Sequence, residues 1–330
     1  MNIKILSRND VKRSVTMPQA IDVVKQAFIS LAQKKAILPL RTQVTVKEYE
    51  GITLFMPAYL PEIESLGTKI VSVFPQNAKN NRPTIHAMVI ICEARTGQPS
   101  AMMDGTYLTA LRTGAASGIA TDLLAHKEAK TAAIFGAGVQ GRTQLEAICC
   151  VRDIQKVLVY DNNLRSARSF SEEMQKHGDP IPGDIVAVDS PEKAVSEADV
   201  ICVATTSSIP VFKDRHLRSG VHINGVGSYT PRMQEIPEKT ILRAKVVVDS
   251  ITASLEEAGD LIIPIKKGLI DESHIQGELG QVASGFLSVR ESEADITFFK
   301  SVGLAIQDLA VAELALRKAA ELRLGMDIEL

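Results

Sequence analysis

The segment TAAIFGAGVQG, residues 131–141, decides the fold of this chain. An apolar run is followed by three glycines, Gly136, Gly138 and Gly141, and then by residues typical of a helix. Strand, tight turn and helix in this order let the backbone approach a pyrophosphate, while the helix N-terminus points its N–H groups and positive dipole end at that charge. The segment therefore predicts a dinucleotide site that includes Val139 and Gln140. A glycine-rich turn in another α/β fold is the alternative.

A second apolar run, residues 156–160, ends at Asp161, 20 residues after Gly141. An acid at this position accepts hydrogen bonds from an adenosine ribose and repels a 2′-phosphate, so NADH is favoured over NADPH. Asn162 and Arg165 follow Asp161. Arg165 is able to reach a 2′-phosphate, which leaves NADPH as the second cofactor.

Strand and helix patterns alternate from residue 130 onward, which is typical of a doubly wound α/β fold. The strands are apolar throughout, as expected when helices cover both faces of a parallel sheet. The predicted strands are 131–135, 156–160, 184–188, 199–204, 221–225 and 245–249, and the predicted helices are 139–151, 164–176 and 191–197.

The chain before residue 128 has a different pattern. A helix over 17–34 precedes short strands between 41 and 96 that predict a mostly antiparallel sheet, and a helix covers 104–124. The tail helix, 303–322, is too apolar to be solvated, so we expect it to return to the N-terminal part or to join a partner subunit. The sequence thus predicts a Rossmann-type doubly wound domain, 128–303, inserted in an α+β domain formed by 1–127 and 304–330.

Bulk properties exclude several classes of protein. The 330 residues carry a formal net charge of −2 with both signs interspersed, which argues against a nucleic-acid partner. No apolar run approaches the roughly 20 residues that span a bilayer, so we expect no membrane partner. The four cysteines show neither CxxC pairing nor the Cys/His spacing of a metal site. These features favour a cytoplasmic protein without a metal.

Polar residues follow two further predicted strands. Thr205, Thr206 and Ser207 come after the strand 199–204, and Val226, Gly227 and Ser228 come after 221–225. Carboxyl ends of parallel strands face the ligand in this fold class, so both loops are candidates for cofactor binding. Capping of a turn or helix is the alternative for the hydroxyls.

Arg112 lies in an otherwise charge-free helical segment, residues 109–116. An arginine in such surroundings must be paired or functional. We therefore expect it to bind a ligand.

Three segments together resemble the ornithine cyclodeaminase/μ-crystallin family: DGTYLTALRTGAAS at 104–117, the glycine turn at 136–141, and FKSVGLAIQD at 299–308. The resemblance runs nearly end to end. It implies a homodimer that exchanges hydride between a nicotinamide and the α-carbon of a small amino or imino acid, with the first domain serving substrate binding and dimerisation. By the same resemblance, Arg41, Lys69 and Arg112 hold the substrate carboxylate, Ser301 and Gly303 lie near the substrate and nicotinamide, and Thr113 contacts the cofactor. Lys69 and Arg112 are the expected catalytic residues, since the Lys69 ammonium is also able to polarise or protonate an imine nitrogen.

One departure from the family pattern bears on the reaction. Cyclodeaminases carry a general-base aspartate just before a proline, and aligned on Pro231 this position holds Tyr229. Oxidation and cyclisation of ornithine need such a base, whereas a preformed cyclic imine accepts hydride without one. We therefore expect reduction of Δ1-pyrroline-2-carboxylate to L-proline, or of Δ1-piperideine-2-carboxylate to L-pipecolate. The alternatives are an ornithine cyclodeaminase or alanine-type dehydrogenase, and a non-catalytic ligand-binding protein like μ-crystallin.

Overall fold

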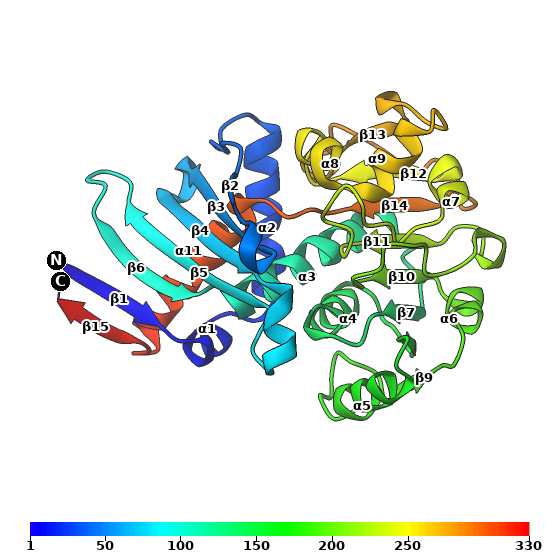
Figure 1. Ribbon diagram of the computed structural model, residues 1–330, viewed down its shortest axis with the longest axis horizontal. Coiled ribbons are helices and arrows are strands. Elements are labelled where there is room, and N and C mark those ends of the chain that lie inside the picture. The colour runs from blue at the N-terminus through cyan, green and yellow to red at the C-terminus, as the bar shows by residue number, and fades with distance from the viewer. Residues whose placement is uncertain (330) are drawn as a thin grey trace. The chain divides into compact units, whose positions relative to one another are not determined.

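The computed structural model describes residues 1–329 and divides into two compact units (Figure 1). Unit 1 combines Met1–Arg112 with the chain from Leu304 onward, and unit 2 is Thr113–Gly303. The first division falls inside the continuous helix α3 (Gly105–Leu124), whereas the sequence prediction put it after residue 127. A helix carries no sequence signal for such a division, because its backbone hydrogen bonds continue through it.

Unit 1 is built on a seven-stranded sheet in the order β15-β1-β6-β5-β4-β3-β2. All neighbours pair antiparallel except β1 and β6, and β15 places the end of the chain beside its beginning (Figure 1). The strands are β1 (Asn2–Leu6), β2 (Thr42–Val46), β3 (Gly51–Leu60), β4 (Ser65–Val73), β5 (Ile85–Glu93), β6 (Pro99–Asp104) and β15 (Met326–Glu329). The antiparallel arrangement expected for residues 41–96 is confirmed by the pairing of β2 to β5.

Three helices belong to unit 1 beside the first part of α3: α1 (Arg8–Ser14), α2 (Met17–Ala32) and α11 (Ala305–Glu321). Thr16 is the N-cap of α2, and its backbone N–H donates to Gln19 Oε1 at 3.1 Å. The tail helix α11 packs against β3, β4, β5 and α2. Most of α11 is buried, which explains why its sequence is so apolar.

Unit 2 is built on an eight-stranded sheet in the order β13-β12-β14-β11-β10-β7-β8-β9, and every pairing in it is parallel. The predicted doubly wound architecture is confirmed. The strands are β7 (Thr131–Phe135), β8 (Lys156–Tyr160), β9 (Asp184–Ala187), β10 (Val200–Val203), β11 (His222–Gly225), β12 (Lys245–Val248), β13 (Ile275–Glu278) and β14 (Thr297–Lys300). The helices are α4 (Val139–Val151), α5 (Leu164–Met174), α6 (Pro191–Glu197), α7 (Glu238–Arg243), α8 (Ile251–Glu257), α9 (Gly259–Lys266) and α10 (Leu279–Ala283).

Alternation along β7 shows how the sheet is covered on both faces. Ala132 and Ile134 join a core cluster with residues of α4 and α5, whereas Ala133 and Phe135 join a second cluster with residues of α6, α7 and α9. All four side chains are fully buried. A strand buried on both faces must be apolar at successive positions, which is the pattern that the sequence shows.

Sequence patterns did not reveal the elements between β12 and α11. The strand β14 holds only four residues, two of them polar at its ends, yet it pairs with both β11 and β12. The strand is buried because neighbouring strands flank it in the sheet. Four residues are too few to show a periodic pattern in the sequence. Two short elements of unit 1, α1 and β6, were missed for the same reason.

Across residues 1–329, no helix is both long and apolar enough to cross a membrane. Cys92, Cys149, Cys150 and Cys202 are free thiols.

Candidate functional site

The glycine turn between β7 and α4 leaves room on one side only. Gly136 has φ of +98°, and a Cβ there would lie 2.5 Å from the carbonyl oxygen of Ala204. A Cβ at Gly141 would lie 2.2 Å from the carbonyl oxygen of Gly136. A Cβ at Gly138 would meet no atom within 4 Å. Two glycines thus serve close packing, and the third opens the turn where a pyrophosphate is expected, so the turn fits a dinucleotide.

The N-terminus of α4 begins at this open turn. Gly138 is its N-cap and supplies no side-chain hydrogen bond. The backbone N–H groups of Val139 and Gln140, which begin the helix, are therefore able to donate to a phosphate. The Val139 side chain is 55% exposed, and Gln140 Oε1 is buried without a hydrogen-bond partner in the described chain. Both features suit a surface that a ligand covers.

Asp161 directly follows β8 and lies against the glycine turn. Its carboxylate accepts hydrogen bonds from the backbone N–H of Ala137 and of Asn163, both at 2.9 Å. Asn163 in turn caps α5 by accepting from the N–H of Arg165, whose side chain is exposed. The acid therefore lies beside the glycine turn, with Asn162 in the loop that leads to α5 and Arg165 in the first turn of that helix.

The predicted cofactor residues of unit 2 follow neighbouring strands. In the order β11-β10-β7-β8, the loops of Val226–Ser228, Thr205–Ser207, the glycine turn and Asp161 come at successive carboxyl ends. From β7 the chain continues to β8 and β9 on one side, and from β10 it continues to β11 on the other. The loops after β7 and β10 therefore flank the topological switch point, where α/β proteins bind ligands. Thr113 belongs to unit 2 as well, in the second part of α3.

Two predicted cations of unit 1 meet at a carboxylate. Lys69 on β4 is 1% exposed and Arg112 on α3 is 5% exposed. Both contact the carboxylate of Asp308 on α11, and the Asp308 side chain is fully buried. Lys69 Nζ lies 2.7 Å from Asp308 Oδ2, and Arg112 Nε lies 3.0 Å from Asp308 Oδ1. Arg112 Nη1 also donates to Gln307 Oε1 at 2.7 Å. We call these four residues the Asp308 cluster.

The cluster holds more positive than negative charge. Burial and the charge of Arg112 lower the pKa of Lys69 to about 7, while Asp308 opposes this shift and Arg41 adds to it. Arg41, directly before β2, is thus close enough to be felt at Lys69. In the cluster one carboxylate faces two cations, so the arrangement favours an additional anion.

The Gln307 side chain offers that anion a donor. Its Oε1 accepts from Arg112 Nη1 and from the backbone N–H of Leu304 at 3.4 Å, which fixes the orientation of the amide. Its Nε2 is buried and has no hydrogen-bond partner among the described residues. A buried, unsatisfied donor beside surplus positive charge fits a carboxylate ligand.

Ser301 and Gly303 belong to unit 2, at its junction with unit 1. Asp249, directly after β12, accepts hydrogen bonds from Ser301 Oγ at 2.8 Å and from the N–H groups of Val302 and Gly303 at 2.8 and 2.7 Å. Gly303 has φ of +84°, which favours glycine. These two predicted substrate residues therefore lie on a segment of unit 2 that Asp249 fixes.

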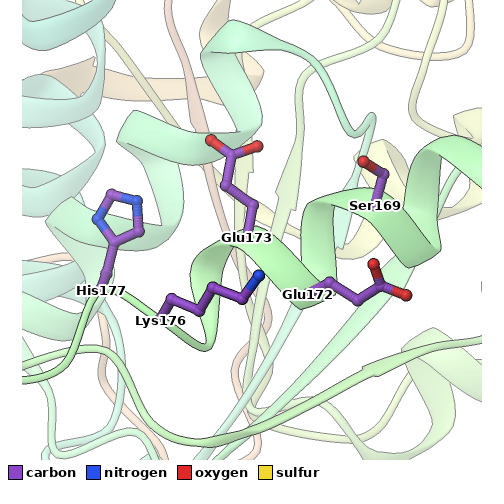
Figure 2. Close-up of a pocket in the computed structure, with 5 residues that line it drawn as sticks. All are labelled: Ser169, Glu172, Glu173, Lys176 and His177. Atoms are coloured by element: carbon purple, nitrogen blue, oxygen red, sulfur yellow. The ribbon is translucent and has the colours of Figure 1, made fainter.

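A surface depression at the end of α5 carries none of the predicted residues. Figure 2 shows an open depression at the end of α5, lined by Ser169, Glu172, Glu173, Lys176 and His177. Among residues 1–329 no group of His, Cys, Asp and Glu side chains is arranged to hold a metal ion.

Sequence reasoning missed three buried acids at these sites: Asp249, Asp308 and Glu235. Asp308 had a usable signal, because with Gln307 it interrupts an apolar helix just as Arg112 does. Glu235 and Asp249 lie in or beside loops, where a charged residue is ordinary, so their burial was not visible.

The fold and these sites define the class as an oxidoreductase with a Rossmann-type nucleotide domain. The chain belongs to the ornithine cyclodeaminase/mu-crystallin family, whose model matches residues 1–321.

Three relatives are similar along their whole length. A Delta(1)-pyrroline-2-carboxylate reductase of Bacillus cereus is 42% identical over 327 residues, covering 98% of this chain and 99% of the relative. The structure of the Thermococcus litoralis Delta(1)-pyrroline-2-carboxylate reductase with NADH and L-proline is 45% identical, with a TM-score of 0.95, and covers 99% of this chain and 100% of that one. An archaeal alanine dehydrogenase dimer with bound NAD is 34% identical, with a TM-score of 0.93 and full coverage of both chains.

Replacing Asp308 by Asn should strongly destabilise the fold, because it leaves Arg112 and Lys69 buried without their counter-charge. We expect the free energy of unfolding to fall by about 3–5 kcal/mol in urea denaturation at neutral pH. Asp327→Asn is the control, since the Lys4–Asp327 pair on the surface is worth about 1 kcal/mol or less. Equal losses in the two variants would contradict the description of the Asp308 cluster.

Proposed function

We propose that this protein reduces a small cyclic imino acid with NADH. The leading reaction is Δ1-pyrroline-2-carboxylate to L-proline, and the second is Δ1-piperideine-2-carboxylate to L-pipecolate. The observation that carries the proposal is the Asp308 cluster, where one buried carboxylate faces two buried cations and leaves surplus charge for a substrate carboxylate. The names of the Bacillus and Thermococcus relatives point to the same reaction.

The residues of unit 1 act on the substrate. Arg112 and Lys69 bind the carboxylate, with Arg41 adding charge, and Asp308 holds the first two in place. With a pKa of about 7, the Lys69 ammonium is also able to give a proton to the imine nitrogen near neutral pH. Ser301 and Gly303 contact the substrate from the segment that Asp249 holds.

The residues of unit 2 bind the cofactor, which supplies the hydride that adds to the imine carbon. Gly136, Gly138, Val139, Gln140 and Gly141 hold the pyrophosphate at the turn. Asp161 reads the ribose with Asn162 and Arg165 beside it, which favours NADH and leaves NADPH as the weaker cofactor; the related structures contain NADH and NAD. The remaining contacts come from Thr113, the loop of Thr205, Thr206 and Ser207, and the loop of Val226, Gly227 and Ser228.

Cyclodeamination is the less favoured reaction because a base is missing. Burial raises the pKa of Tyr229, so its phenol stays protonated at neutral pH. Glu235 is the nearest acid after Pro231 in the sequence, but it is fully buried and accepts four hydrogen bonds from Thr205, Gly227 and Ser228. Neither group is suited to take a proton from ornithine.

Two other readings remain distinct from reduction of a cyclic imine. An alanine-type dehydrogenase would use the same cations for an open-chain substrate. A non-catalytic protein like μ-crystallin would need neither an open glycine turn nor surplus buried charge, and this chain has both.

The protein is further proposed to act as a homodimer in the cytoplasm. Unit 1 leaves apolar side chains exposed on one face of its sheet, among them Val44 on β2, Phe55 on β3 and Met88 on β5. A second copy would cover them, and the related archaeal alanine dehydrogenase is a dimer. Free cysteines suit a reducing compartment.

The reaction is tested with a panel of substrates and both cofactors. Purified protein should oxidise NADH with Δ1-pyrroline-2-carboxylate or its six-membered homologue faster than it oxidises ornithine or alanine with NAD. Asp161→Ala should narrow the preference for NADH over NADPH. Release of ammonia from ornithine at a comparable rate would refute the argument from Tyr229, and absence of turnover with every imino acid would favour the non-catalytic reading.

The pH dependence tests the part played by Lys69. Because its pKa is lowered to about 7, the ammonium is present below that pH and is lost as the pH rises through it. We expect kcat/KM to fall above about pH 7 in the wild type. Lys69→Arg should remove this decline at a lower overall rate, because a guanidinium stays protonated. A decline of the same midpoint in both proteins would belong to the imine itself and would contradict the assignment.

A further inference from the structure

A buried carboxylate connects the two loops at the carboxyl ends of β10 and β11. Glu235 Oε1 accepts from the backbone N–H and from the hydroxyl of Thr205, both at 2.7 Å. Glu235 Oε2 accepts from the backbone N–H of Gly227 at 2.7 Å and of Ser228 at 2.8 Å. Each oxygen thus holds a different loop, and the side chain is fully buried.

The loops are packed as tightly as this bonding implies. A Cβ on Gly227 would lie 2.1 Å from the carbonyl oxygen of Thr205 and 2.4 Å from Glu235 Oε1. Only glycine fits at this position. The spacing of the two loops is therefore set by the carboxylate between them.

A second layer holds Glu235 itself. Asp260 on α9 accepts from the backbone N–H groups of Glu235 and Ile236 at 2.7 and 2.9 Å. Lys300 at the end of β14 lies 3.6 Å from Asp260 and donates to the carbonyl oxygen of Gly225 at 3.1 Å. Burial and the Asp260 carboxylate raise the pKa of Glu235 to about 7, while Lys300 and Thr205 oppose the shift. Burying such a cluster of charged groups is unfavourable in free energy, so we expect it to serve a function at this edge of the sheet.

We propose that Glu235 is a positioning residue for the dinucleotide: its carboxylate holds the Thr205 loop and the Gly227–Ser228 loop in the arrangement that binds the cofactor. This assignment rests on the proposed cofactor site of unit 2, since both loops belong to that set. Glu235 acts through them and does not touch the substrate, because all four of its hydrogen bonds are made within the protein. A carboxylate suits this task because each oxygen accepts two donors.

The test replaces one oxygen without changing the shape. In Glu235→Gln, the amide nitrogen faces two hydrogen-bond donors, so one loop loses its acceptor. The dissociation constant of NADH, measured by fluorescence titration without substrate, should rise about tenfold, a change of about 1.4 kcal/mol. In turnover assays, the KM for NADH should rise more than kcat falls.

Thr205 gives a milder variant that keeps the test available if Glu235→Gln folds poorly. Thr205→Val removes the hydroxyl that Glu235 accepts from, and Thr205→Ser restores it. We expect weaker NADH binding in the first and near wild-type binding in the second. In the double variant Glu235→Gln with Thr205→Val, the loss should be smaller than the sum of the single losses, because both changes break one interaction.

Asp199→Asn is the matched control. Asp199 also accepts from two backbone N–H groups, those of Lys130 and Thr131, but at the amino end of β7. This variant should lose stability and keep its affinity for NADH within about twofold, a difference of less than about 0.5 kcal/mol.

Three outcomes would overturn the assignment: wild-type NADH affinity in a folded Glu235→Gln variant, additive losses in the double variant, or an equal loss of affinity in Asp199→Asn. A protein that binds NADH but reduces no imine would instead refute the proposed reaction and leave this assignment standing. Failure of the wild type to bind NADH would refute both.

Discussion

The Asp308 carboxylate is the contact on which the account of unit 1 depends. It pairs with Lys69 from β4 and Arg112 from α3, and it comes from α11, nearly 200 residues later in the chain than Arg112. One acid allows two buried cations to exist, but its single negative charge does not neutralise both. The same contact therefore ties the C-terminal helix into unit 1 and leaves positive charge for a ligand.

Unit 2 uses acidic side chains in a different way. Asp161, Glu235 and Asp249 each accept backbone N–H groups from a segment of the predicted cofactor or substrate set. A carboxylate that accepts several N–H donors fixes a loop without needing a cation. The loops at the carboxyl edge of the parallel sheet are thus held by side chains that lie outside the glycine motif.

Much of unit 2 was predictable because β7, α4 and β8 show the simple hydrophobic patterns of a strand, a helix and a strand. Each of the three glycines in the turn is also required for a physical reason. The prediction was weakest where burial arises from tertiary context. The strand β14 is too short to show periodicity, and Glu235 resembles any loop acid in the sequence. Arg112 was recognisable because it is the one charged residue in an apolar helical segment. Asp308 also interrupts an apolar helix, but the sequence analysis did not use this signal.

The central claim is that the surplus positive charge of the Asp308 cluster selects a carboxylate. Its most direct test compares kcat/KM for Δ1-pyrroline-2-carboxylate with that for Δ1-pyrroline, the same ring without the carboxylate, in the wild type and in Arg112→Ala. The account predicts that the wild type prefers the acid by about 10³-fold or more, since a site built for a charged group is left unpaired by an analogue that lacks it. Arg112→Ala should lose most of that preference. Similar kcat/KM values for the two imines in the wild type would contradict the claim.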